Sequence, residues 1–186
     1  MADQGQVKTE ELDAQQEAKR RLALAQIRQY PDPVLRLEAQ EVQEFDDDLK
    51  QLVERMSRLM QDARGVGLAA NQVGVLRRVF VIQAAEEEEP RALVNPVIVD
   101  KSEEAELDDE GCLSMQGVVV EVERPIRVRM EAHDETGEPV ELELEGLPAR
   151  VAQHELDHLD GVLILDRTSD EDRREALAVL RQAAAL

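Results

Sequence analysis

Two histidines four residues apart form the motif with the clearest chemical meaning in this chain. His154 and His158 flank Glu155 in the run QHELDHLDG. On a helix, positions four apart share one face with Cβ atoms about 5–6 Å apart, so both imidazoles can reach one transition metal. The carboxylate beside the first histidine can then handle protons for a water on that metal. The motif therefore indicates a metal-dependent hydrolase, whereas a surface helix with two chance histidines is the alternative.

The single cysteine of the chain, Cys112, is a candidate third ligand. It stands in the run EGCLSMQG, and a lone cysteine excludes an internal disulfide, as expected in a reducing compartment. Most lone cysteines are small buried hydrophobes. A catalytic metal site, however, has three protein ligands and an open fourth position, and two histidines leave one ligand missing. A site made of Cys112, His154 and His158 is therefore chemically sensible.

A third unusual stretch is GVGLAANQVG, from Gly65 to Gly74. Its glycines and small residues suit a chain that passes close to another backbone or to a ligand. Gln72 adds a neutral amide that can donate hydrogen bonds. A tight helix-to-strand connection without chemistry is the alternative for this stretch alone.

The elements that must position these residues can be predicted from periodicity. The HExxH run lies in a helical pattern with apolar positions at Leu147, Val151, Leu156 and Leu159. Pro148 suits the first helical turn, and Gly161 suits the C-terminal stop. A second helix is predicted to begin at the cap Asp46 and to end at Gly65, and a third to begin at the cap Ser169.

The middle of the chain predicts strands. Short β runs cover 78–82 and 92–99, and a hairpin is predicted over 127–145 around the turn Glu135-Thr136-Gly137. Apolar residues alternate with charged ones in this hairpin, as in an antiparallel sheet with one buried face. His133 falls on the polar face, so we exclude it as a metal ligand.

Composition limits the function classes. A chain of 186 residues fits one domain with a real core, and no apolar run is long enough to span a membrane. The formal net charge of −20 argues against binding nucleic acid through its phosphates. The acidic residues between 86 and 110 are interpreted as a solvated surface. The N-terminus lacks the apolar core of a secretory signal, so a cytoplasmic location is predicted.

Taken together, the runs GVGLAANQ, EGCLS and QHELDH resemble the three signature motifs of the peptide deformylases, in the same order. The run YPDPVLR, Tyr30–Arg36, is also similar to the start of that family's domain. The resemblance implies an α+β fold, with antiparallel and mixed sheets around a central helix that bears HExxH. It covers 23–168 as the catalytic domain. A polar N-terminal extension, 1–22, is expected to be a frayed helix or disordered, and 169–186 is expected to form a C-terminal helix.

The resemblance also implies a role for each motif residue. Cys112, His154 and His158 match the metal ligands, and Glu155 matches the general acid/base. Gln72 and the backbone N–H of Leu113 match the groups that stabilise the oxyanion. The implied activity is hydrolysis of a linear amide: removal of the formyl group from the N-terminal formylmethionine of newly made proteins. The implied cofactor is one divalent metal ion, Fe2+ first, with Zn2+, Ni2+ or Co2+ as alternatives.

Substrate contacts are predicted from neighbours of the motifs. Val66, Leu147 and Val151 are expected to line an apolar slot for the methionine side chain. The peptide beyond methionine is expected to add as a strand along Gly65–Leu68, which includes Gly67. The expected partners are formylmethionyl nascent peptides, with a transient ribosome contact and neither direct nucleic-acid nor membrane binding.

Two other functions and two departures from the family pattern stay open at this point. An HExxH metallopeptidase would need a further ligand after the helix, where Glu175 is available but no histidine follows His158. A catalytically inactive deformylase-like binding protein is the other alternative, and the intact Glu155 and Gln72 argue against it. Gln116 replaces a common proline, which is expected to loosen the segment after Cys112, and Asn71 is a milder change.

Overall fold

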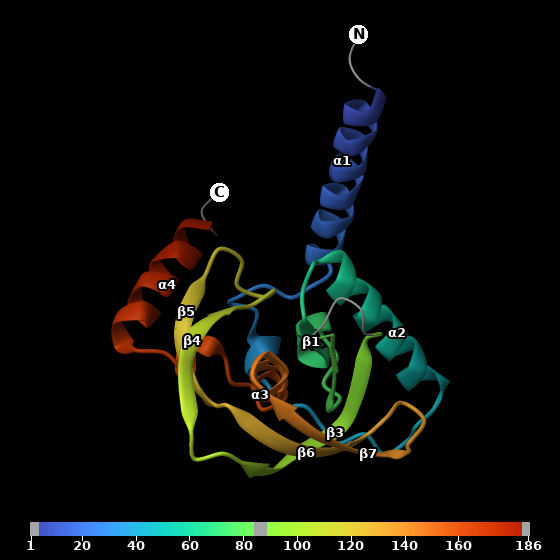
Figure 1. Cartoon of the computed structure of the whole chain (residues 1–186), viewed down its shortest axis with the longest axis vertical. Helices are drawn as coiled ribbons and strands as arrows, with labels where there is room; N and C mark the ends of the chain where they lie inside the picture. The colour runs from blue at the N-terminus through green and yellow to red at the C-terminus, as the bar shows by residue number, and fades with distance from the viewer. Residues whose placement is uncertain (1–3, 84–88, 184–186) are drawn as a thin grey trace.

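The histidine-bearing helix predicted from the sequence lies at the centre of the molecule (Figure 1). In the computed structural model, which describes residues 4–83 and 89–183 and side chains from residue 13 onward, this helix is α3, Leu147–Leu159. Pro148 stands in its first turn, and Gly161 follows its end with a φ of 70°. The helix packs against β1 (Gly67–Ala69) and β2 (Val79–Ile82) of one sheet and against β5 (Val119–Pro125) of another. Its side chains therefore face elements from distant parts of the sequence.

Five antiparallel strands form the larger sheet, in the order β1-β2-β3-β6-β7. These strands are β1 Gly67–Ala69, β2 Val79–Ile82, β3 Arg91–Lys101, β6 Arg127–His133 and β7 Pro139–Glu145. The predicted hairpin is confirmed, because β6 pairs with β7 from Arg127↔Glu145 to His133↔Pro139. Its alternation is confirmed as well: Val128, Met130 and Ala132 are buried. Met130 and Ala132 belong to a core cluster with residues of α3.

A smaller sheet holds the cysteine in place. β4, Ala105–Gly111, pairs antiparallel with β5, Val119–Pro125, and the last pair is Gly111↔Val119. Cys112 therefore follows directly where the ladder ends. The alternate residues Val120 and Val122 of β5 are buried in a core cluster with the segment around Leu163.

The second helix, α2, spans Asp47–Asp62. The Oδ1 atom of Asp46 accepts a hydrogen bond from the Leu49 N–H at 2.9 Å, which confirms the predicted cap. The predicted end at Gly65 is wrong by three residues: the helix ends at Asp62, and Arg64 takes the left-handed conformation with a φ of 58°. Gly65 instead packs closely on Leu113, since a Cβ there would lie 2.7 Å from Leu113 Cδ1 and that side chain would have to shift.

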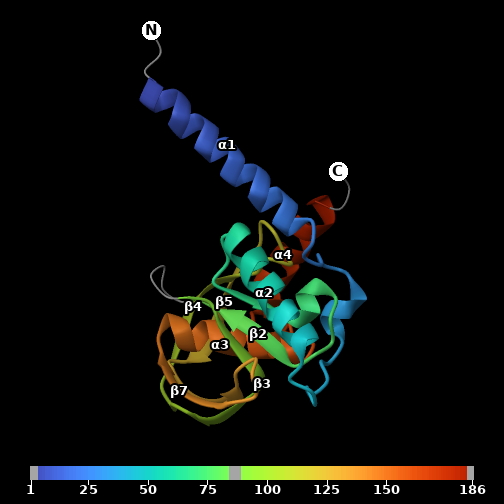
Figure 2. The same ribbon diagram turned by 90° about the vertical axis from the view of Figure 1, so that its right-hand side faces the viewer.

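The two terminal helices lie at the same end of the molecule (Figures 1 and 2). α1 spans Gln4–Leu24 and projects away from the body, so the described part of the extension is helical. Its last residues, Ala23 and Leu24, are buried in the core cluster that α2 covers. α4 spans Asp170–Ala183 and packs against β5, and Ser169 Oγ accepts a hydrogen bond from the Asp172 N–H, which confirms the predicted cap. The observed architecture confirms the α+β prediction.

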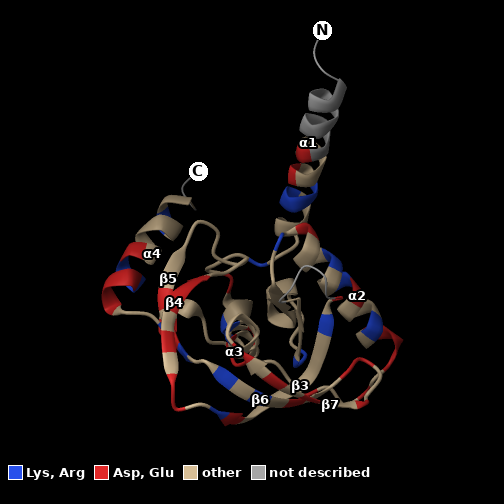
Figure 3. Ribbon diagram, viewed as in Figure 1, with Lys and Arg blue, Asp and Glu red and all other residues tan. Residues whose placement is uncertain are grey.

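Charged residues are distributed over many of the helices and strands (Figure 3). Acidic segments predominate on α4 and on the β4–β5 sheet, while a basic band crosses α1 close to the body. Most of the acidic run 86–89 falls outside the described residues. Within the described residues, no helix has the length and apolar character of a membrane span.

Candidate metal centre

Three side chains from two distant segments converge beside α3. The Sγ atom of Cys112 and one ring nitrogen of each histidine, His154 and His158, all lie within 4.8 Å of one another. Cys112 Sγ lies 3.3 Å from His158 Nε2, and the two imidazole centroids are 4.9 Å apart. The spacing of four residues places both rings on one face of the helix, and the end of β4 brings the sulfur to them. The geometry therefore unites the three predicted ligands.

The orientation of His154 is set by Glu110. Its Nδ1 atom lies 2.9 Å from Glu110 Oε2, which directs Nε2 toward Cys112 and His158. A carboxylate that accepts the other ring N–H in this way fixes the tautomer and the ring direction of a metal-binding histidine. Burial lowers the pKa of His154, but its hydrogen bonds with Cys112 and Glu110 outweigh burial and raise that pKa well above the ordinary value. Metal binding at Nε2 therefore releases a proton.

Glu110 is held by a buried ionic network. Arg124 contacts both of its oxygens, at 2.6 and 2.9 Å, and Arg150 contacts Oε1 at 2.9 Å. Arg124 also reaches Asp157 on α3 at 2.9 Å, and Asp157 in turn pairs with Arg167 at 2.6 Å. Burial raises the pKa of Glu110, but the hydrogen bonds from Arg124 and His154 outweigh burial and lower the pKa to about 2. The carboxylate is therefore charged at neutral pH and can accept a hydrogen bond from the Nδ1–H group of His154.

The sulfur of Cys112 is surrounded by donors. The backbone N–H of Ser114 points to Sγ at 3.4 Å, and the side-chain amide nitrogen of Gln72 lies 3.6 Å from it. Gln72 comes from the short helix η2, Ala70–Val73, and its Oε1 accepts the Ala69 N–H at 2.8 Å. That acceptor contact turns the NH₂ end of the amide toward Cys112. Donors of this kind can hydrogen-bond to the sulfur of a thiolate, which is the form of cysteine that binds metals.

Glu155 is the buried carboxyl group of the site. Its side chain is 4% exposed, and its Oε2 atom has no hydrogen-bond partner among the described residues. Burial raises the pKa of Glu155 to about 7. A group with a pKa near the working pH is suited to accept a proton and return it. Gly67 packs directly on this carboxylate, because a Cβ there would lie 2.4 Å from Oε1.

The donor set fits a divalent transition metal. One thiolate and two imidazoles match catalytic sites with three protein ligands and an open position. Burial lowers the pKa of His158 well below its ordinary value, so that ring is neutral and available as a ligand. The unpartnered Oε2 atom of Glu155 beside these donors offers an acceptor for a reacting group. These residues therefore fit the metal that the sequence motifs imply.

A cavity of about 390 Å³ opens beside the donor cluster, with Cys112 and His154 in its wall. Its walls include Cys112, Leu113, Gln72, His154, Glu155 and the four predicted substrate residues Val66, Gly67, Leu147 and Val151. Val66 and Leu147 are 44% and 54% exposed, while Val151 is buried. Larger hollows of about 560 and 850 Å³ lie elsewhere and contain none of the three donors. Exposed apolar side chains next to buried polar groups are typical of a small-molecule or peptide site.

Known proteins share this arrangement along most of the chain. A family model described as polypeptide deformylase matches residues 24–174. The chain belongs to the polypeptide deformylase family. A peptide deformylase of Thermotoga neapolitana is 49% identical over 147 residues, which cover 79% of this chain and 88% of that protein. Peptide deformylase 1 of Corynebacterium glutamicum is 45% identical over 165 residues, which cover 88% of this chain and 98% of that protein.

Solved structures agree with the family assignment. The crystal structure of a peptide deformylase from Legionella pneumophila superposes with a TM-score of 0.81 at 40% identity, covering 86% of this chain and 94% of that one. The chain is thus a deformylase-family hydrolase that removes the formyl group from N-terminal formylmethionine. The family match favours this function over an HExxH metallopeptidase and over an inactive binding protein.

Sequence reasoning missed the residues that support the ligands. Glu110 precedes the cysteine by two positions in the run EGC, and a carboxylate so close to a ligand was the available signal. Arg124 and Arg150 gave no local signal, because they meet Glu110 only through sheet pairing and helix packing. The segment after Cys112 is held despite the missing proline: Gln116 donates to Gln29 at 3.2 Å, and Gln29 donates to the Leu113 carbonyl at 2.9 Å. At the other departure, Asn71 donates to the Leu37 carbonyl at 2.7 Å.

Proposed function

We propose that this chain performs the deformylation with one divalent metal held by Cys112, His154 and His158 and with Glu155 as general acid/base. The observation that carries the proposal is the convergence of the three donors within 4.8 Å beside a buried carboxyl group. When bound, the metal would polarise the formyl carbonyl and lower the pKa of water at the site to near neutrality. Fe2+ is the proposed ion, and Zn2+, Ni2+ and Co2+ also suit this ligand set.

Glu155 would move the protons of the reaction. It accepts a proton from the water that attacks the formyl carbon, and it delivers a proton to the amine nitrogen as the carbon–nitrogen bond breaks and formate leaves. Its pKa of about 7, raised by burial, makes both transfers feasible near neutrality. The Oε2 atom without a hydrogen-bond partner supports this role, because it is free to meet the reacting groups.

Gln72 and the Leu113 N–H would stabilise the oxyanion. The carbonyl oxygen gains negative charge when the formyl carbon becomes tetrahedral, and fixed donors lower the energy of that state. Gln72 supports this role because its amide oxygen is engaged by Ala69, which leaves the NH₂ group directed at the metal ligands. Ser114 Oγ, 3.1 Å from the same nitrogen, also helps to fix the amide.

The substrate would enter through the cavity over the ligands. Val66, Leu147 and Val151 are proposed to line the slot for the methionine side chain, and Gly67 is proposed to contact the peptide backbone. A Val66→Trp substitution fills the slot and should raise KM or abolish turnover; unchanged kinetics would contradict this assignment. Because the substrates are nascent peptides, we place the action of the protein in the cytoplasm, with transient contact to the ribosome.

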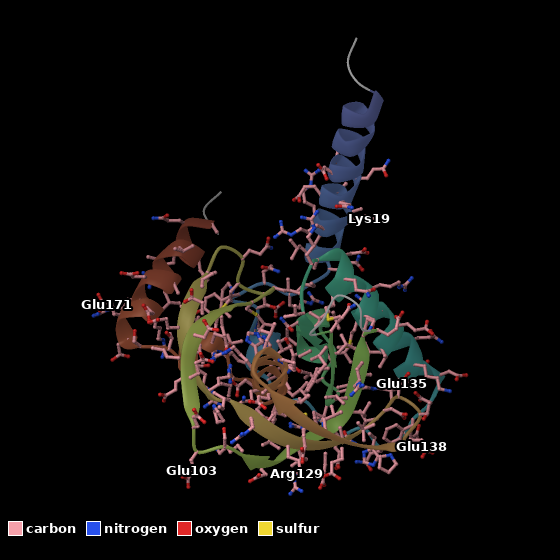
Figure 4. The ribbon with its side chains drawn as sticks, in the orientation of Figure 1. Lys19, Glu103, Arg129, Glu135, Glu138 and Glu171 are labelled. Atoms are coloured by element: carbon pink, nitrogen blue, oxygen red, sulfur yellow. The ribbon has the colours of Figure 1, made fainter. Side chains whose placement is uncertain are left out.

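The activity test measures formate release from formyl-Met-Ala-Ser under anaerobic conditions. Protein loaded with Fe2+ should release formate, and Glu155→Gln should lose nearly all activity while keeping its metal. Glu171→Gln is the matched control, because this exposed glutamate lies on α4 (Figure 4). Absence of formate release with Fe2+, Ni2+, Co2+ or Zn2+ would instead favour the inactive binding protein.

A second variant separates deformylase from metallopeptidase. Cys112→Ala should remove the metal if the sulfur is a ligand, whereas an HExxH metallopeptidase with another third ligand would keep it. Metal content of the purified variant, measured by elemental analysis, distinguishes the two.

A further inference from the structure

The N-terminal helix contributes to the wall of the substrate cavity. Arg20 and Leu24 of α1 line the cavity of about 390 Å³ together with Cys112 and His154, two of the three proposed metal ligands. Leu24 is buried in the core, which fixes the last turn of the helix against the body. Arg20 lies one turn earlier, and its side chain is 40% exposed. The extension is therefore part of the site and not merely an appendage.

A second arginine lies at the same rim. Arg64 lines the cavity, and its NH2 group donates to Gln16 of α1 at 3.3 Å. It also has a φ of 58°, which is unfavourable for a residue with a side chain. Glycine is the usual residue after a helix in this conformation, because a Cβ atom is unfavourable there. An arginine in this strained conformation beside a cavity points to a use for its side chain.

These two charges are weakly compensated. Among the described side chains, Arg20 pairs with the exposed Glu17 at 3.6 Å and Arg64 contacts a neutral amide, and the exposed Asp109 also lines the cavity. Arg150 also lines the cavity, but Glu110 neutralises it at 2.9 Å. The chain as a whole is strongly acidic, with a formal net charge of −20. Figure 3 shows a basic band on α1 close to the body, one of several basic segments of the molecule.

We propose that Arg20 and Arg64 form a cationic rim that binds a carboxylate of the substrate, carried two or three residues after the formylmethionine. The inference rests on the proposed function, because it assumes that the formyl group lies at the metal ligands. The cationic rim makes the enzyme prefer nascent chains that carry an aspartate or glutamate two or three residues after the formylmethionine. A free C-terminal carboxylate of a short peptide offers the same chemistry, and the test separates the two sources.

The distances along the chain agree with a substrate carboxylate at this position. Gly67 contacts Glu155 at the reacting end of the cavity, and Arg64 precedes it by three residues. Three extended residues span at most about 10–11 Å. A bound extended peptide advances about 3.3 Å per residue. A carboxylate two to three residues beyond the methionine therefore comes level with the arginine rim.

The test compares kcat/KM for three amidated peptides: formyl-Met-Ala-Glu, formyl-Met-Ala-Gln and formyl-Met-Ala-Lys. The native enzyme should prefer the glutamate over the lysine peptide by about two- to fivefold at low salt, as expected for exposed ion pairs. The preference should weaken in 0.5 M NaCl, because salt screens exposed charges. Comparing formyl-Met-Ala-Ser as acid and as amide shows whether a terminal carboxylate is recognised too.

Substitutions at the rim should change the ratio of kcat/KM for the glutamate peptide to kcat/KM for the lysine peptide. Arg20→Gln and Arg64→Asn should bring the glutamate-to-lysine ratio close to one, and Arg20→Glu should invert it. Asparagine is chosen at 64 because it tolerates the left-handed conformation. Lys19→Gln is the matched control. It removes the same charge from the residue of α1 that precedes Arg20, and this lysine is exposed and does not line the cavity (Figure 4).

Two results would overturn the inference: no preference in the native enzyme, or an equal loss of preference in Lys19→Gln. Either result leaves the proposed function intact as long as the glutamine peptide is deformylated. If no peptide is deformylated, the proposed function fails, and equilibrium binding of the same peptides decides the inference. Tighter binding of the glutamate peptide, lost in Arg20→Gln, would support it, and equal binding would refute it.

Discussion

The Nδ1 atom of His154 lies 2.9 Å from Glu110 Oε2, and this contact joins a metal ligand to a buried ionic network. Arg124 holds Glu110 on one side and Asp157 of α3 on the other. The strand that ends at the cysteine and the helix that carries both histidines are therefore tied by the same guanidinium group. The relative positions of all three ligands depend on this connection.

Replacing Glu110 should weaken metal binding. Glu110→Gln keeps the shape of the side chain but loses the charge that orients His154, so the affinity for the metal should fall about 10- to 100-fold. Competition with a chelator of known affinity measures the change. Glu106→Gln is the control, because this glutamate is exposed on the same strand. Equal affinities in the two variants would contradict the role of Glu110.

Replacing Gln72 should slow the chemical step. Gln72→Glu keeps an oxygen for the Ala69 N–H but removes the NH₂ donor, so kcat should fall about 10²- to 10³-fold. KM and metal content should change little, because the lost interaction forms mainly in the transition state. A kcat within threefold of the native value would rule out the oxyanion role.

A methyl group at Gly67 should displace the general acid/base. In Gly67→Ala the new Cβ would lie 2.4 Å from Glu155 Oε1, so the carboxylate must move. A displacement of about 1 Å typically costs about 10²-fold in rate. Gly111→Ala is the comparison, because its Cβ would meet the Val118 carbonyl at an ordinary 3.7 Å. Similar rates for both variants, measured by formate release, would contradict the prediction.

Removing the metal should lower thermal stability. A ligand present at 100 times its Kd stabilises the native state by about 2.7 kcal/mol, which corresponds to roughly 5–10 °C in Tm for a chain of this size. Scanning calorimetry before and after chelation measures the difference. Cys112→Ala should show no such shift, and a shift of native size in that variant would exclude Cys112 as a ligand.

The acid sensitivity of the fold should depend in part on Asp166. Partial burial raises the pKa of Asp166, but hydrogen bonds from Arg36 and the Leu163 N–H outweigh burial and lower that pKa below its ordinary value. A lowered pKa stabilises the fold above the ordinary value of 3.8, and the effect is lost as the pH falls through the folded-state pKa. Asp166→Asn should therefore be less stable than the native protein at neutral pH, and the gap should close in acid. Urea unfolding at several pH values tests this, and a gap independent of pH would contradict it.

Local patterns in the sequence predicted the elements that local forces determine. The hairpin around Glu135-Thr136-Gly137, the caps at Asp46 and Ser169, and the helix of His154 follow from alternation, capping and periodicity. The end of α2 was predicted wrongly because Gly65 has a different cause. Gly65 has no side chain, and Leu113 packs in the space that a Cβ would take. Leu113 lies 48 positions later in the sequence, so this packing has no local signature.

By itself, the sequence determined the chemistry: a cysteine, two histidines four residues apart, a glutamate between them and a glutamine, in motifs that identify the family. Helical spacing alone places the two histidines on one face, because that geometry repeats within a single turn. Only the tertiary structure brings Cys112 to within 3.3 Å of His158, orients His154 through Glu110 and places Arg20 at the cavity rim. These contacts join segments far apart in the chain, so they depend on sheet pairing and core packing and not on neighbours in sequence.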